Sequence, residues 1–85
     1  MVQVNQIAGI NACAAYFAQA NYQVETSFYK TGCSCTVFFD EMEKRQSIIK
    51  SMRYHADESD SIRFFEKKLG KRHVYMLKLE KVSIL

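Results

Sequence analysis

Apolar side chains recur every three or four residues near the start of the chain, which is the spacing of an amphipathic helix. Ile7, Ile10 and Phe17 mark the face that such a helix would bury, and the residues between them are small or neutral. Asn21 follows as a stop. The pattern therefore predicts a helix over residues 6–20.

Two further segments carry helical spacing. Asp40 can cap a helix that runs to residues 54–56, because aspartate accepts hydrogen bonds from free backbone N–H groups. A polar break at residues 57–60 precedes a third helix, which we expect to end at Gly70. The apolar positions that predict these helices are Met42, Ile48, Ile49, Met52 and Ala56 in the first, and Ile62, Phe65 and Leu69 in the second.

Alternation of apolar and polar side chains predicts strands elsewhere. Residues 22–29 and 33–39 alternate in this way, and Gly32, which tolerates a positive φ, supplies the turn between them. We therefore expect a β-hairpin. Residues 73–82 read as a long final strand that could be central in a sheet, and residues 2–4 as a short strand at best.

These elements follow the order (β)αββααβ, which is typical of the α+β class. We expect a single domain over residues 1–85, with an antiparallel sheet of three or four strands and helices packed on one face. If residues 2–4 pair as an edge strand, the order is the ferredoxin-like βαββαβ with the second helix broken in two.

The formal charges are unevenly divided along the chain. Residues 1–39 carry two, Glu25 and Lys30, whereas residues 40–85 carry nineteen. Since a soluble domain usually spreads charge over its exterior, the neutral half predicts a contact face, with a homodimer as the expected assembly. The candidate self-association residues are Asn11, Ala15, Tyr16, Gln19, Tyr22 and Tyr29.

A basic cluster occupies eleven residues where the third helix is expected to turn into the last strand. Such a cluster can hold phosphates or an acidic protein surface. The plain alternative is a solvated helix end at which lysines suit the helix dipole. The candidate macromolecule-binding residues are Arg63, Lys67, Lys68, Lys71, Arg72 and His73.

Cysteine and histidine offer a further candidate, a zinc site made of Cys33, Cys35, His55 and His73. Thiolate and imidazole are the preferred zinc ligands, but one residue between two strand cysteines is not the usual spacing. The alternative is that both cysteines are small core side chains. No motif indicates a reaction or a phosphate-binding loop, so we expect no enzyme and no cofactor.

The remaining composition restricts the compartment rather than the activity. The chain has 85 residues, a formal net charge of +3 and three cysteines, an odd number that argues against a disulfide framework. The sequence shows no secretory signal and no stretch long enough to span a bilayer. We therefore expect a cytoplasmic protein with reduced thiols and no membrane partner.

These observations lead to three hypotheses. The first is a non-enzymatic binding protein, resembling the small inhibitors and regulators of phages and mobile elements, which binds a host protein such as a nucleic-acid-processing or defence enzyme. Asp57, Glu58 and Asp60 would then mimic phosphates, or the basic cluster would grip an acidic loop. The alternative is a nucleic-acid-binding regulator that uses residues 63–73, and the second alternative is a zinc-stabilised interaction module.

Overall fold

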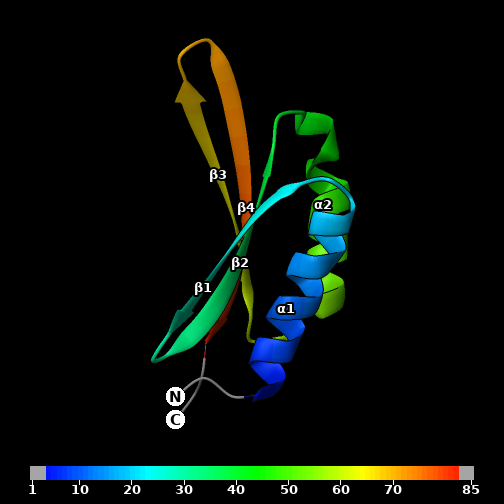
Figure 1. The fold of residues 1–85 in the computed structure, drawn as a ribbon, viewed down its shortest axis with the longest axis vertical. Coiled ribbons are helices and arrows are strands. Elements are labelled where there is room, and N and C mark those ends of the chain that lie inside the picture. The colour runs from blue at the N-terminus through cyan, green and yellow to red at the C-terminus, as the bar shows by residue number, and fades with distance from the viewer. Residues whose placement is uncertain (1–3, 83–85) are drawn as a thin grey trace.

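Two helices pack on one face of a four-stranded antiparallel sheet (Figure 1). The computed structural model describes residues 4–82. This architecture confirms the α+β class, the antiparallel sheet and the helices on one face. The elements are α1 (Val4–Gln19), β1 (Gln23–Tyr29), β2 (Gly32–Phe39), the 3-10 helix η1 (Met42–Lys44), α2 (Arg45–His55), β3 (Ser61–Leu69) and β4 (Arg72–Val82).

The fold consists of two αββ units. Each unit is a helix followed by a hairpin. Tyr29 and Gly32 flank the turn of the first hairpin, and Leu69 and Arg72, each 40 residues later, flank the turn of the second. The sheet order β1-β2-β4-β3 brings the second strand of each unit to the centre. Val37 lies opposite Leu77 there, with Val24 and Phe64 beside them on the outer strands. The two units are therefore related by an approximate two-fold axis through this central pair.

The core lies between the helices and the two inner strands. Burial of each large apolar side chain stabilises the fold by about 1.5–3 kcal/mol, and the inner strands provide most of the buried positions because both of their neighbours are strands. The buried apolar residues are Ile10, Cys13 and Phe17 from α1, Ile48 and Met52 from α2, Cys33, Cys35, Val37 and Phe39 from β2, and Leu77 and Leu79 from β4.

The first helix ends where its sequence predicts. Asn21 has a φ of 69°, and the backbone N–H of Tyr22 donates to the carbonyl of Phe17 at 3.0 Å. The ring centroids of these two residues lie 5.7 Å apart. This is a Schellman ending, in which the residue after the left-handed position closes the last turn. At the other end Val4 is already helical, and the remainder of the expected strand at residues 2–4 lies outside the described residues.

The second helix begins later than predicted. Asp40 is not its N-cap: η1 intervenes, α2 starts at Arg45, and Lys44 precedes it without a side-chain capping bond. Met42 is consequently exposed, whereas Ile48 and Met52 are buried as the apolar spacing predicts. The predicted stripe was therefore correct at Ile48 and Met52 but wrong at Met42, because the helix starts about one turn later than expected.

The predicted third helix is wrong, because residues 61–69 form strand β3. Two adjacent phenylalanines made the pattern ambiguous: Ile62, Phe65 and Leu69 fit a helical period, but Ile62 and Phe64 also fit a strand. The strand pairs along its whole length with β4, from Ser61 opposite Glu80 to Leu69 opposite Arg72. The described elements therefore run αββαββ rather than in the ferredoxin-like order.

The two turn glycines act differently from one another. Gly70 has a φ of 63° and closes the β3–β4 turn, whereas Gly32 does not have the positive φ that the sequence suggested. A Cβ on Gly32 would overlap the carbonyl oxygen of Lys81 on β4. Gly32 is therefore required because two backbones approach closely, which is another reason for glycine in a strand.

Candidate nucleic-acid interface

The face of the sheet that points away from α1 and α2 is covered by neither helix (Figure 1). We call it the open face. Because strand side chains alternate between faces, the register assigns its residues directly. They are Gln23, Glu25, Ser27 and Tyr29 from β1, Ser34, Thr36 and Phe38 from β2, Ser61, Arg63, Phe65, Lys67 and Leu69 from β3, and Arg72, Val74, Met76, Lys78, Glu80 and Val82 from β4.

Cations outnumber carboxylates on the open face. It carries two carboxylates, Glu25 and Glu80, and four cations, which are Arg63, Lys67, Arg72 and Lys78. Arg63 Nε and Lys78 Nζ lie 3.6 and 3.7 Å from the same oxygen of Glu80, so that carboxylate is shared by two cations. The remaining positive charge therefore lies toward the β3–β4 turn, at Lys67 and Arg72.

Apolar side chains cross the open face beside these cations. Phe38, Met76 and Phe65 are neighbours in one row across three strands, and Phe65 is 41% exposed. Leu69, nearer the turn, is 53% exposed. An exposed apolar surface with cations at its border is unusual for a plain solvated face, and it is the kind of surface on which nucleobases stack.

The basic cluster lies on the β3–β4 hairpin, whose tip projects beyond the helices (Figure 1). Lys67 and Arg72 point to the open face, Lys68 and His73 to the opposite one, and Lys71 occupies the turn. The His73 Nε2 atom lies 3.3 Å from Glu66 Oε1. The six residues therefore belong to one projecting hairpin, although not to a single face of it.

This placement removes one explanation of the cluster. The sequence allowed Lys67 and Lys68 to be cations that suit the C-terminal dipole of a helix, but they lie on a strand. Lysines on an edge strand can also prevent aggregation. That role accounts for the charge on β3, but not for Arg72 on the inner strand β4 or for the apolar surface beside it.

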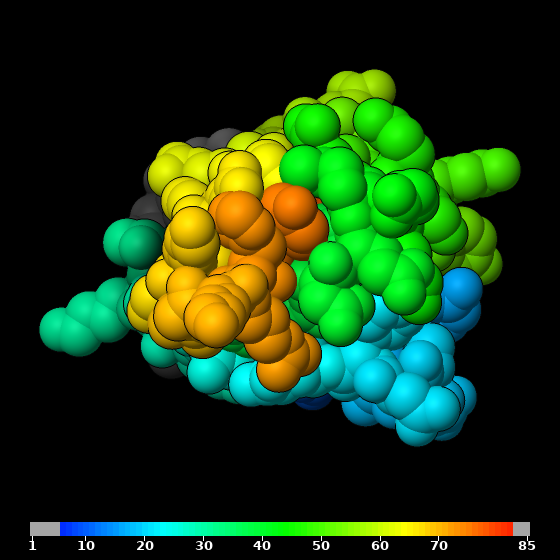
Figure 2. Space-filling view, turned by 90° about the horizontal axis from the view of Figure 1, so that it is seen from above, coloured from blue at the N-terminus to red at the C-terminus, as the bar shows by residue number. Residues whose placement is uncertain are grey.

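A groove of about 580 Å³ lies between the hairpin tip and the start of β1. Figure 2 looks down on this end of the molecule, with the hairpin in yellow to orange beside the green and cyan segments. Three cations line the groove, and Asp40, 3.9 Å from Arg72, is the one carboxylate among its lining residues. Its charged and apolar walls include Lys44, Lys67, Arg72, Phe38, Leu69 and Met76.

The predicted self-association residues do not form one surface. Asn11, Ala15, Tyr16 and Gln19 are exposed on α1, as expected. Tyr22 is half-buried against Phe17, with the Lys44 ammonium 5.6 Å from its ring centroid. Tyr29 lies on the open face, where its hydroxyl is 3.4 Å from that of Ser34. The prediction therefore combined an exposed helix surface with two tyrosines that lie elsewhere.

The zinc candidates are also dispersed. Cys33 and Cys35 are buried on the core side of β2, while His73 lies on the hairpin beside Glu66. Among the residues that the structure describes, no three His, Cys, Asp or Glu side chains are grouped to hold a metal ion. Cys33, Cys35, His55 and His73 therefore do not assemble into a site, and the interpretation of the two cysteines as core residues is confirmed.

The thiols are poorly placed for chemistry. Burial raises the pKa of Cys33. The thiols of Cys13 and Cys35 share a hydrogen bond, which lowers the pKa of Cys13 and raises the pKa of Cys35. All three side chains are closed to solvent, so a substrate could not reach a thiolate even where one is favoured.

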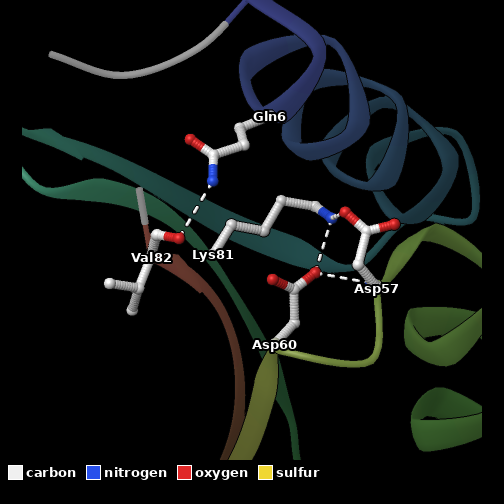
Figure 3. Close-up of polar contacts among 5 residues, drawn as sticks. All are labelled: Gln6, Asp57, Asp60, Lys81 and Val82. Carbon is white, nitrogen blue, oxygen red and sulfur yellow. Dashed lines mark hydrogen bonds and ion pairs between the residues drawn. The ribbon is translucent and has the colours of Figure 1, made fainter. Parts of the chain in front are cut away.

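The acidic loop is attached to β4 through Asp60, whereas Asp57 and Glu58 are exposed. Lys81 is 3% exposed, and its Nζ lies 2.6 Å from Asp60 Oδ2 and 3.6 Å from Asp57 Oδ2 (Figure 3). The backbone N–H of Asp57 also donates to Asp60. Asp60 therefore anchors the loop to β4, and only Asp57 and Glu58 of the three proposed phosphate mimics remain accessible to a partner.

Phe38, Phe65 and Met76 are the candidate residues that the sequence did not reveal. Phe65 was assigned to a helix core, so its position on the open face depended on recognising β3 as a strand. The signal was present in the alternation Ile62, Arg63, Phe64, Phe65, since one phenylalanine of an adjacent pair must leave the core in a strand.

Comparisons with known proteins add no functional assignment. No protein-family model matches this sequence, and no curated protein matches it either. None of the helices in the described part of the chain has the length and apolar character needed to cross a membrane. The chemistry of the open face and of the β3–β4 hairpin is therefore the guide to function.

Proposed function

We propose that this protein binds nucleic acid, without catalysing a reaction, through the open face and the projecting β3–β4 hairpin. The observation that carries the proposal is that basic and exposed apolar side chains occupy the same surface, around a groove bordered by Lys44, Lys67 and Arg72. Cations would contact phosphates and fix the position of the strand. Phe65 and its neighbours would contact the bases.

The charge distribution suits this function better than a general attraction to anions. The formal net charge of the whole chain is only +3, yet five basic side chains lie between residues 67 and 73. A local concentration of this kind directs a polyanion to one place, whereas a net charge of this size spread over the surface would not. The hairpin is therefore proposed as the first contact with the phosphate backbone.

The test is a binding titration with fluorescently labelled oligonucleotides, measured by anisotropy for single-stranded DNA, single-stranded RNA and duplex DNA. We expect the Lys67→Glu/Arg72→Glu variant to lose at least about tenfold in affinity, because two phosphate contacts become repulsive. The matched control is Lys50→Glu/Arg53→Glu, which makes the same change of charge at exposed positions of α2.

Equal losses in the two variants would show that binding depends on net charge rather than on the hairpin. If the wild-type protein binds none of the three probes, the proposal is contradicted. Circular dichroism and urea unfolding of both variants show whether the substitutions disturb the fold.

A protein partner on the helical side is the second candidate. Tyr16 and Tyr54 are 53% and 85% exposed and line a hollow of about 390 Å³ with Lys50, Ser51 and His55. Exposed tyrosines beside the uncharged surface of α1 are good contact chemistry for a protein. This surface is where the hypothesis of an inhibitor or regulator of a host protein would apply.

Its test uses Tyr16→Ser/Tyr54→Ser. Partners captured from a host lysate treated with nuclease should be lost in this variant and kept in Lys67→Glu/Arg72→Glu. A partner that is retained by both variants, or lost in the hairpin variant alone, contradicts a binding site on the helical side.

A further inference from the structure

β1 is the less protected edge of the sheet. Its outer side is not paired with any other strand of the described chain, and it carries one formal charge, Glu25, in seven residues. The opposite edge, β3, carries four charges in nine residues. Natural proteins use charges, and lysine above all, to keep sheet edges from pairing. Since β1 has neither lysine nor proline, its edge is open to another strand.

The neutral surface continues from β1 over the helix that packs on it. α1 contains no charged residue along its whole length, and it contacts both β1 and β2. Asn11, Ala15 and Ala18 are exposed and small. A chain that pairs with the β1 edge would therefore meet small uncharged side chains and would bury no charge there, which avoids a large desolvation cost.

We propose that β1 pairs antiparallel with β1 of a second copy of this chain, across a two-fold axis at Thr26. An interface of this kind is isologous, because the same strand is used by both copies. Val24 of one copy then lies opposite Phe28 of the other, on the same face of the sheet. On the open face, Gln23 lies opposite Tyr29 and Glu25 opposite Ser27.

Charge and length together select this register. Centring the pair on Glu25 would place two carboxylates directly opposite each other, which is destabilising. Centring it on Ser27 avoids that contact but leaves only residues 25–29 paired out of the strand Gln23–Tyr29. The Thr26 register pairs the whole strand and keeps each Glu25 beside a serine. Shifting one β1 strand by a single residue relative to the other would place each side chain from the core face opposite a side chain from the open face.

The pairing accounts for two features that the single chain leaves without a role. Phe28 and Tyr29 are 52% and 48% exposed, and each acquires a cross-strand neighbour, Val24 and Gln23 respectively. The scarcity of charge in residues 1–39 also follows, since that half supplies the strand and the helix nearest the contact. The product is one continuous eight-stranded sheet with all helices on one side.

The test is site-directed disulfide cross-linking under native conditions, with a mild thiol oxidant such as diamide. Thr26→Cys should give a covalent dimer, because residues directly opposite in an antiparallel pair lie within the Cα separation that a disulfide spans. Ser27→Cys is the matched control, because the two introduced cysteines of a dimer are then diagonal rather than directly opposite neighbours, about 7–8 Å apart. Mixing Glu25→Cys with Ser27→Cys should restore cross-linking. The natural cysteines are buried.

Light scattering during gel filtration gives the second readout. The wild-type mass should approach twice 9.9 kDa as concentration rises, and Thr26→Lys should shift it back to the monomer because like charges face each other across the axis. Ser61→Lys, on the opposite edge, should leave it unchanged.

A wild-type protein that is monomeric at every concentration overturns the proposal, as does equal cross-linking of Thr26→Cys and Ser27→Cys. A series of larger assemblies contradicts the closed two-fold pair. A dimer that survives Thr26→Lys shows that the copies meet elsewhere, on α1 for example, and also overturns it.

Discussion

Gly32 lies at one end of the β2–β4 ladder, opposite Val82, where the two backbones approach closely. Its missing side chain lets β2 approach the β4 backbone at Lys81, whereas Gly70 is required for its positive φ and has open space around it. Gly32 therefore meets a steric requirement, whereas Gly70 meets a conformational one.

Substitution by alanine should distinguish them. Gly32→Ala is expected to lower the free energy of unfolding by about 2–3 kcal/mol, because the backbone must shift to admit a methyl group. Gly70→Ala should cost about 1 kcal/mol, the usual penalty for a left-handed alanine. Urea unfolding measures both values. A Gly32→Ala variant as stable as Gly70→Ala would contradict the close approach of the two strands.

Lys81 holds the other critical contact, with the carboxylate of Asp60 (Figure 3). Lys81→Met should cost about 3–5 kcal/mol, because Asp60, whose side chain is 2% exposed, keeps a buried charge without its partner. The double variant Lys81→Met/Asp60→Leu should recover most of that loss. Lys71→Met, in the exposed turn, is the control and should change stability by less than about 0.5 kcal/mol. Equal costs for the single and double variants would contradict the buried pair.

His55 should make stability depend on pH. Burial, and then the charge of Lys81, lower its pKa below the ordinary value of 6.5. As the pH falls through 6.5, the unfolded chain binds a proton at His55 before the folded chain does, so the free energy of unfolding decreases. That loss ends below the folded pKa. Relative to His55→Gln, the wild type should lose stability on acidification, as urea unfolding at several pH values would show. Parallel pH profiles would contradict the shift.

Among the elements, β3 shows where sequence reasoning failed. Local patterns predict a single structure for three features, which are the β1–β2 hairpin, the end of α1 at Asn21 and strand β4. Residues 61–69 admit two structures, because Phe64 and Phe65 provide an apolar residue for either period. Pairing with β4 decides between them, and such long-range contacts are not visible in a local window. The composition of the basic cluster was therefore predictable, but its scaffold and the open face were not.

The strand assignment has its own test. Phe64 points to the core side, where the guanidinium carbon of Arg45 lies 4.5 Å from its ring centroid and the Tyr75 ring stacks at 6.0 Å. Phe65 points to the open face. Phe64→Ala should therefore cost about 2–3 kcal/mol and Phe65→Ala less than about 1 kcal/mol, measured by urea unfolding. The reverse order would indicate the helical periodicity instead.

At the scale of the whole molecule, two αββ units of similar geometry differ in their charge. The first unit carries almost no formal charge, and the second carries nearly all of it, including the projecting hairpin. The same backbone therefore presents a neutral edge on one side and a basic edge on the other. The substitutions that test the two proposals also lie apart, because Thr26 is on β1 whereas Lys67 and Arg72 are on the β3–β4 hairpin.

The most direct test of the central claim is the salt dependence of oligonucleotide binding. If the hairpin contacts phosphates, the logarithm of the affinity falls linearly with that of the salt concentration, and Lys67→Ala/Arg72→Ala should reduce the slope by about 1.4 for a single strand. The control Lys50→Ala/Arg53→Ala should leave the slope unchanged. Binding that is insensitive to salt, or slopes that are equal in the wild type and the hairpin variant, would contradict the account.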